Sequence, residues 1–239
     1  VPVEEGLDAK RFLREAELLR RLEHPHLVRC LDAGGAGAWL WMAMQDLEAE
    51  HLAAHVAARH PAPADPRIVK WLVHALLGLR ALHGMRVVHR DIKPENLLVA
   101  RDGNLLVADL GLAYHEERSR LTVSAALVGS AAWFPPELLQ GGRADARSDI
   151  YQWALVGYWL VSGALPFPGE DPLAASSRRC FEPVAPLTAV APVVDPLLSD
   201  LIERNLAADP AHRSHTAHEL LADLIPLWSA ALGPAPVAA

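Results

Sequence analysis

A run of apolar side chains between residues 148 and 161 constrains the fold most, because it leaves almost no polar face for water. A helix that is apolar on nearly all sides has to be enclosed by other elements, so the chain must form a body around it. The longest nearly uncharged part, Tyr151 to Val161, is too short to cross a bilayer. The start of the chain also lacks the basic segment and apolar run of a secretion signal. We therefore expect a globular domain around a buried central helix, with no membrane span in this sequence.

Composition narrows the functional classes. The 239 residues suffice for one large domain or two small ones, and 51% hydrophobic with 21% charged residues is a globular balance. The net charge of −7 argues against a nucleic acid as the main partner, since a phosphate backbone attracts basic proteins. The two cysteines, Cys30 and Cys180, lie far apart, so neither a disulfide framework nor a cysteine zinc site is expected. This pattern favours a reducing environment.

Hydrophobic periodicity predicts a mostly helical chain with a few strands near its start. Apolar residues at helical spacing indicate a helix over 9–22, and Pro66 after the cap residue Asp65 begins a second helix that runs to residue 84. Further helices are expected over residues 148–161, 172–180, 196–206 and 216–228. Two short strands, 27–31 and 39–44, are expected to form a hairpin through a turn that contains Gly34, Gly35 and Gly37.

A second hairpin is the clearest in the chain. Residues 97–100 and 105–108 read as strands, and Asp102-Gly103 supplies the turn between them. Asn96 stands immediately before the first strand and Asp109 immediately after the second. Because an antiparallel pair brings its open ends within about 5 Å, these two side chains are expected to lie close together. An amide oxygen and a carboxylate are hard ligands of the kind that Mg²⁺ takes while it keeps waters and phosphates.

The loop before this hairpin adds a carboxylate and a cation. Asp91 lies five residues before Asn96, and Lys93 lies between them. Asp91 can accept a proton from a hydroxyl, whereas Lys93 can neutralise charge on a phosphoryl group during transfer. An isolated Asp in such a loop is usually only solvated, but its spacing to Asn96 and Asp109 indicates a phosphoryl-transfer site.

At these residues the chain resembles the Ser/Thr protein kinases, most closely the eukaryotic-like kinases of bacteria. The motifs are His89-Arg90-Asp91 followed by Asn96, then Asp109-Leu110-Gly111, then Pro136-Glu137. The resemblance implies an α+β, protein-kinase-like fold with a partial small lobe, made of the regulatory helix plus two strands, and a complete, mainly α-helical large lobe. It places the remnant of the small lobe and the hinge at 1–45, the large catalytic lobe at 46–232 and the start of a linker at 233–239.

The resemblance also implies roles for individual residues. Asp91, Lys93 and Asn96 would be catalytic, and Asn96 with Asp109 would hold the metal. The nucleotide's adenine would meet the hinge and an apolar floor, formed by Met42, Ala43, Met44 and Leu98. Structural roles fall to Asp149, which would brace the catalytic loop, and to the ion pair of Glu137 and Arg213. Arg90 would clamp a phosphate on the activation loop, for which the candidate acceptors are Ser119, Thr122 and Ser124.

Two parts of the kinase pattern do not occur in the sequence. No Gly-rich phosphate loop is present, and none of the three lysines, Lys10, Lys70 and Lys93, fits the third-strand lysine that holds the phosphates. Glu15 matches the glutamate that pairs with this lysine and lies within an apolar stripe, where a lone carboxylate is costly. We therefore expect its partner upstream of Val1, and we expect the chain by itself to be a weak kinase.

The resemblance implies ATP and Mg²⁺ or Mn²⁺ as cofactors and proteins with Ser or Thr hydroxyls as substrates. A homodimer of the kinase is left open. No nucleic-acid partner is expected. The implied location is cytoplasmic, either as a free protein or as the cytoplasmic part of a longer membrane-anchored one.

Several alternatives stay open at this point. The chain can instead be a pseudokinase-like scaffold that binds proteins without catalysis. Glu15, Glu137 and Arg213 can each be plain surface charges, and the segment with Ser119 can be only a loop. The twelve histidines form no zinc motif, so they are read as surface residues.

Overall fold

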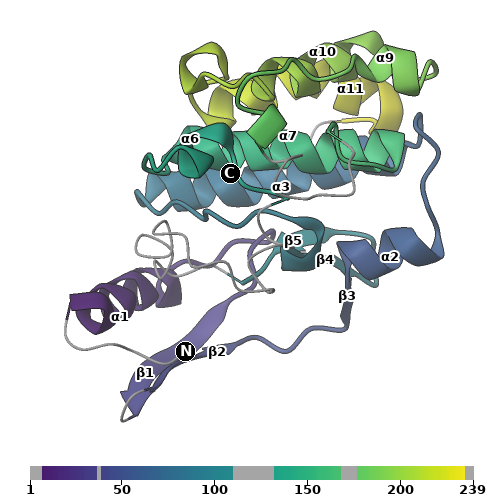
Figure 1. Ribbon diagram of the computed structural model, residues 1–239. Helices are drawn as coiled ribbons and strands as arrows, with labels where there is room; N and C mark the ends of the chain where they lie inside the picture. Colours follow the sequence, from purple (N-terminus) through teal and green to yellow (C-terminus); the bar gives the residue numbers. More distant parts are fainter. Residues whose placement is uncertain (1–6, 37–38, 110–131, 168–176, 235–239) are drawn as a thin grey trace.

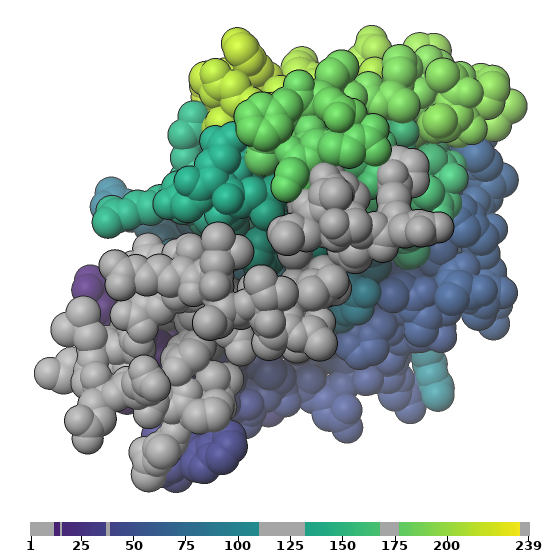
Figure 2. Space-filling view, viewed as in Figure 1, coloured from purple at the N-terminus to yellow at the C-terminus, as the bar shows by residue number. Residues whose placement is uncertain are grey.

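The computed structural model describes residues 7–36, 39–109, 132–167 and 177–234, without the side chains of residues 7–11 and of Glu15. It combines a helical body with two small antiparallel sheets, so the expected α+β class is confirmed. Figure 1 shows the first elements at one end of the molecule and the last helices at the other. In the space-filling view the same order is visible, from purple at the lower left to yellow-green along the top (Figure 2).

The N-terminal elements are the helix α1 (Leu7–Arg20) and the strands β1 (Cys30–Ala36) and β2 (Trp39–Met44). The two strands pair antiparallel, and α1 packs against them through a small cluster of Phe12, Ala16 and Leu40. A Cβ on Gly34 would lie 2.7 Å from the Trp41 ring across the pair, so the glycine makes room for this tryptophan.

The predicted bounds of the first strand were wrong. The strand begins at Cys30 rather than at Leu27, and Gly34 lies within β1 rather than in the turn. The reason is that the preceding residues pair elsewhere, since Val28 N–H donates to the carbonyl of Val107 at 2.9 Å and Val107 N–H donates to that of His26 at 2.9 Å. These bonds attach residues 26–28, which lie between α1 and β1, to the strand that contains Val107 in the second sheet.

The second sheet has the order β3-β4-β5, and the loop 89–96 leads into its middle strand. Its strands are β3 (Ala49–His51), β4 (Leu97–Ala100) and β5 (Leu105–Val107), and β4 and β5 are the hairpin that the Asp-Gly turn predicts. β3 and the helix α2 (Leu52–Ala58) that follows it were not predicted. Three residues of β3 are too few to show an alternating pattern.

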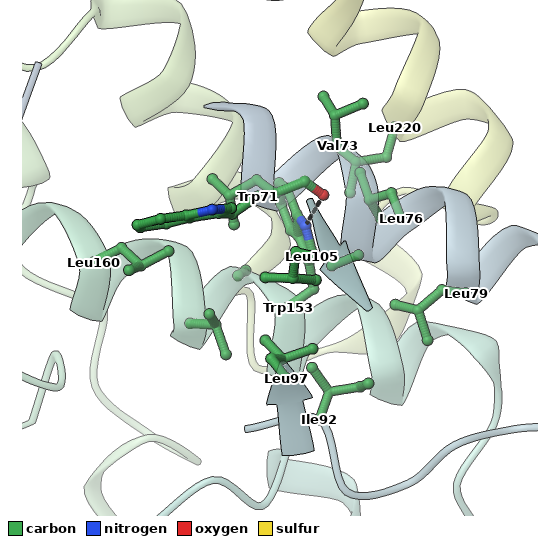
Figure 3. Packing of buried hydrophobic residues seen from close by; sticks show 14 of the residues in the cluster. Trp71, Val73, Leu76, Leu79, Ile92, Leu97, Leu105, Trp153, Leu160 and Leu220 are labelled. Carbon is green, nitrogen blue, oxygen red and sulfur yellow. Dashed lines mark hydrogen bonds between the residues drawn. The ribbon is translucent and has the colours of Figure 1, made fainter. Parts of the chain in front are cut away.

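Two long helices form the centre of the body. α3 (Pro66–Gly84) is capped by Asp65, whose carboxylate accepts the N–H of Arg67, and α7 (Ala146–Ser162) starts with a capping box between Asp145 and Ser148. The predictions of both helices are confirmed. Figure 3 shows their packing, in which the indole N–H of Trp153 donates to the backbone carbonyl of Leu72 at 2.9 Å. This bond satisfies a polar group within an otherwise apolar core.

The remaining described elements cover α3 and α7. They are α6 (Pro136–Leu139), α9 (Leu187–Val190), α10 (Pro196–Asn205), the short 3-10 turn η2 (Pro210–His212) and α11 (Ala217–Leu232). α11 packs on α3 and α10 packs on α7. The predicted helices over 196–206 and 216–228 are confirmed, whereas most of the one over 172–180 lies outside the described residues. Within the described part of the chain, no helix is both long and apolar enough to span a membrane.

Candidate active site

The carboxylate of Asp91 is the centre of a hydrogen-bonded cluster. Its Oδ2 accepts from Lys93 Nζ at 2.7 Å and from Asn96 Nδ2 at 2.9 Å, and Asn96 Nδ2 also donates to the carbonyl of Asp91 at 2.7 Å. The short 3-10 turn η1 (Pro94–Asn96) brings Asn96 back to Asp91. The other oxygen, Oδ1, is buried and has no hydrogen-bond partner in the part of the chain that the structure describes. The hydrogen-bonding capacity of that oxygen is therefore unused among the described residues.

The ends of the hairpin meet beside this cluster. The N–H of Ala108 donates to the carbonyl of Asn96 at 2.8 Å, so Asp109 follows directly opposite the start of β4. Asp109 is exposed and has a φ of 51°, in the left-handed region, where a non-glycine residue is uncommon. His89 fixes this end of the sheet, since its Nε2 lies 3.0 Å from the carbonyl of Ala108 and its Nδ1 accepts the N–H of Asp91 at 3.3 Å.

Side chains of α7 bond to the backbone of the loop 89–96. Asp149 is fully buried and accepts the N–H of Arg90 at 2.7 Å and the N–H of His89 at 2.9 Å. The ring Nε2 of His83 lies 2.8 Å from the same carboxylate. One turn further along, the amide of Gln152 bonds to the same loop. Sequence reasoning singled out Asp149 but missed His83 and Gln152.

A buried ion pair also contacts α7. The guanidinium of Arg213 is fully buried and donates two hydrogen bonds to the carboxylate of Glu137, at 2.9 and 2.8 Å. Ser148 Oγ donates to the same carboxylate at 2.6 Å. Arg213 also lies over the ring of Tyr151, 4.6 Å from its centroid. Burial raises the pKa of the Tyr151 hydroxyl to about 12, so that hydroxyl stays neutral beside the pair.

The other predicted site residues are more widely distributed. Met42, Ala43 and Met44 lie at the end of β2 and are half-buried, and Leu98 lies in β4, also half-buried. Arg90 has a φ of 70°, and its buried Nε has no partner among the described residues. Glu15 lies in α1, but its side chain is outside the described residues. Ser119, Thr122 and Ser124 lie outside them entirely, as do Leu110 and Gly111.

The chain is similar to known proteins over most of its length. The family model of the protein kinase domain matches residues 2–224 of the chain. The chain belongs to the protein kinase domain family. This kinase domain is 35% identical over 214 residues to the serine/threonine-protein kinase PknL of Mycobacterium tuberculosis. It is also 31% identical to PrkC of Bacillus subtilis and 32% identical to PknB of Mycolicibacterium smegmatis, each over 221 residues.

These matches cover nearly all of the chain but only part of each relative. They include 90% of this kinase domain in all three cases. The matched part is 53% of PknL, 33% of PrkC and 35% of PknB. The kinase domain therefore corresponds to about half or less of these longer proteins.

Proposed function

We propose that this kinase domain transfers the γ-phosphoryl group of ATP to serine or threonine hydroxyls of proteins. The observation that supports it most is the state of Asp91, whose Oδ2 is fixed by two donors while its buried Oδ1 has no partner among the described residues. A general base needs such a fixed orientation and one oxygen whose hydrogen-bonding capacity is not already used. The names of the relatives, which are serine/threonine-protein kinases, support the choice of hydroxyl.

Each residue of the cluster has a distinct part in the proposed reaction. Asp91 accepts the proton of the hydroxyl at Oδ1, and Lys93 places a positive charge beside the phosphoryl group. Asn96 uses its amide N–H groups on Asp91, so its amide oxygen is left for a cation. With Asp109 it offers two hard oxygens, which suits Mg²⁺ or Mn²⁺ when phosphates and waters complete the coordination. A bound metal would neutralise charge on the phosphates.

The described residues fit this metal only in the company of a nucleotide. Within the described part of the chain, no group of three or more His, Cys, Asp or Glu side chains is placed to hold an ion. Mg²⁺ is usually held by one or two carboxylates plus the phosphates of its substrate, rather than by a cage of protein groups. We therefore expect weak metal binding without ATP.

The finer assignments belong to the same proposal. Residues 1–45 contribute a partial small lobe and the hinge, 46–232 form the complete large lobe, and 233–239 begin a linker. Adenine is bound at Met42, Ala43 and Met44 above Leu98, and Glu15 orients the phosphate-holding lysine. Arg90 binds a phosphate carried by Ser119, Thr122 or Ser124. Protein substrates and a cytoplasmic location are part of the proposal.

The decisive experiment removes the proposed base. In the natural protein that contains this kinase domain, Asp91→Asn should lower kcat by about 10²–10⁴-fold and leave the affinity for Mg-ATP unchanged. Asp200→Asn is the matched control, because Asp200 is exposed on α10 and far from the cluster in sequence. Transfer to a protein substrate is measured with labelled ATP. Normal transfer by the Asp91 variant would contradict the assignment.

The alternative function, a protein-binding scaffold without catalysis, differs from the kinase in its affinity for Mg-ATP. The 239 residues contain neither the Gly-rich loop nor a lysine that fits the third-strand position. These residues alone should therefore transfer phosphate poorly. Isothermal titration separates the two functions, since the kinase binds Mg-ATP in the natural protein, whereas a scaffold shows no such binding alongside a tight protein partner.

A further inference from the structure

The side chain of Gln152 bonds to the peptide groups on both sides of Asp91. Its Oε1 accepts the N–H of Ile92 at 3.1 Å, and its Nε2 donates to the carbonyl of Arg90 at 3.1 Å. Gln152 lies in the middle of α7 and is fully buried. A buried amide that finds partners for both its oxygen and its nitrogen is held in one orientation. Gln152 therefore constrains the two peptide planes that carry Asp91.

The remaining backbone groups of Asp91 are also bonded. Its N–H donates to His89 Nδ1 at 3.3 Å, and its carbonyl accepts from Asn96 Nδ2 at 2.7 Å. On α7, Asp149 accepts the N–H groups of His89 and Arg90, three residues before Gln152 in sequence. Two successive turns of one buried helix thus hold the loop, the first through its N–H groups and the second through a carbonyl and an N–H.

The amide of Gln152 satisfies both groups that flank Asp91. These two groups are one donor and one acceptor, so a carboxylate or a hydrocarbon would leave at least one of them buried without a partner. A third bond extends the contact, since Nε2 also donates to the carbonyl of Trp133 at 3.2 Å. Trp133 precedes α6, so Gln152 joins the catalytic loop to the segment that leads into Glu137.

We propose that Gln152 is a positioning residue that sets the orientation of the Asp91 carboxylate. It does so by joining the backbone on both sides of Asp91 to the backbone carbonyl of Trp133. The proposal rests on the proposed kinase function, in which Asp91 is the base. Because a small displacement of a reacting group can cost about 10²-fold in rate, the loss of this clamp affects the chemical step more than substrate binding.

The test compares two variants in which a buried amide side chain is replaced by an apolar side chain of similar size. Gln152→Met keeps the length of the side chain and removes its hydrogen bonds. Asn205→Leu is the matched control, because Asn205 is also a fully buried amide that joins two backbone groups, the carbonyl of Leu201 and the N–H of Ser214. Both variants leave buried backbone groups without partners, so both lower the melting temperature, but only one lies at the catalytic loop.

In the natural protein we expect Gln152→Met to lower kcat about 10–100-fold with the KM for ATP changed less than about twofold. Asn205→Leu should keep kcat within about twofold of the unaltered protein. An equal loss of kcat in both variants, or none in Gln152→Met, would overturn the proposal. If Gln152→Met does not fold, Gln152→Glu replaces it. This second variant keeps an oxygen that accepts the N–H of Ile92 and loses the donor to the carbonyl of Arg90. An equal loss of kcat in it and in Asn205→Leu, or no loss in it, would again overturn the proposal.

Hydrogen exchange of the 239-residue chain separates this proposal from the kinase function itself. We expect Gln152→Met to speed exchange of the Ile92 N–H while exchange in α10 and α11 stays unchanged, and Asn205→Leu to leave the Ile92 N–H protected. A protein without any kinase activity would contradict the proposed function, but this exchange pattern would still support the clamp. Unchanged protection of Ile92 in Gln152→Met would refute it even in an active kinase.

Discussion

The loop from His89 to Asn96 is fixed by side chains from distant parts of the chain, whereas α1, β1 and β2 are held largely by one another. Asp149 and Gln152 reach the loop across about 60 positions of sequence. The N-terminal elements instead pack mostly on one another, around a small cluster of Phe12, Ala16 and Leu40, and they join the main core through Leu19 and Cys30. Their outer surface includes Trp39, which is 60% exposed.

This difference teaches where rigidity is located in the kinase domain. Regions with many buried contacts open only when the whole domain unfolds, whereas regions with few such contacts open locally at lower free energy. The proposed base lies in the first kind of region. The proposed hinge residues, Met42 to Met44, end β2, and since Met42 and Met44 pack against the main core they lie at the border between the two regions. The predictions below test this contrast in order of decreasing effect.

The largest effect should come from the buried ion pair of Glu137 and Arg213, which lies in the helical body. Arg213→Met leaves the carboxylate of Glu137 without the guanidinium that is fully buried against it. Removing one partner of such a pair costs about 3–5 kcal/mol, because the other charge stays desolvated. The free energy of unfolding, measured by urea titration, should fall by this amount.

The matched control is an ion pair at the surface. Arg204 lies 2.6 Å from Asp223, but both side chains are nearly half exposed. Arg204→Met should change the free energy of unfolding by about 0–1 kcal/mol, since water solvates the remaining carboxylate. Equal costs for the two arginine variants would show that burial does not make the pair of Glu137 and Arg213 more important than a surface pair.

The second prediction concerns the small N-terminal cluster. Phe12→Ala should remove about 3 kcal/mol of packing from this region, since Phe12 is the largest member of the buried cluster that it forms with Ala16 and Leu40. Hydrogen exchange should become faster in α1, β1 and β2 and stay unchanged in α7. Leu76→Ala, a change in the main core, should instead speed exchange throughout the domain. Faster exchange in α7 on Phe12→Ala would mean that the two regions unfold together.

The same contrast explains which parts of the fold could be predicted from sequence. α3 and α7 carry long apolar patterns with cap residues at Asp65 and Asp145, so local signals fix them. β3 is too short for a pattern. The start of β1 was misplaced because Val28 pairs with Val107, a partner far along the chain that no local signal reveals.

The site followed a similar rule. Asp91, Lys93 and Asn96 lie within one short loop, so their spacing was enough to predict that they meet, and the hairpin brings the backbone before Asp109 back to Asn96. Gln152 was missed because a single polar residue in an apolar helix does not reveal its partners. The usable signal was its position three residues after Asp149, since residues at i and i+3 share a face of a helix.

The third prediction concerns the contact between the segment that follows α1 and the helical body. His26, which follows α1, stacks on His74 of α3 with ring centroids 4.0 Å apart. Burial lowers the pKa of His74 to about 3 and also lowers that of His26. The unfolded chain, with a pKa near 6.5, therefore binds more protons, so this contribution to stability is complete above pH 6.5 and is lost as the pH falls.

The measurement is the slope of the free energy of unfolding against pH between about 5 and 6. His74→Gln keeps an acceptor for the N–H of Leu105, which His74 Nδ1 accepts at 3.1 Å, and removes the titrating group. The other charged groups that act on this pair, Lys70 and Asp102, are unchanged. We expect the slope to fall by about one proton in the variant. An unchanged slope would show that His74 is not buried in its neutral form.

The smallest effect should appear at the exposed surface of β2. Trp39→Phe changes a ring that is mostly in water, so the free energy of unfolding should shift by less than about 0.5 kcal/mol. The same substitution at Trp153 removes a buried hydrogen bond to Leu72 and should cost about 2 kcal/mol. A cost above about 1 kcal/mol for Trp39→Phe would mean that this surface is packed against something in solution, and the N-terminal region would then be less locally held than its contacts indicate.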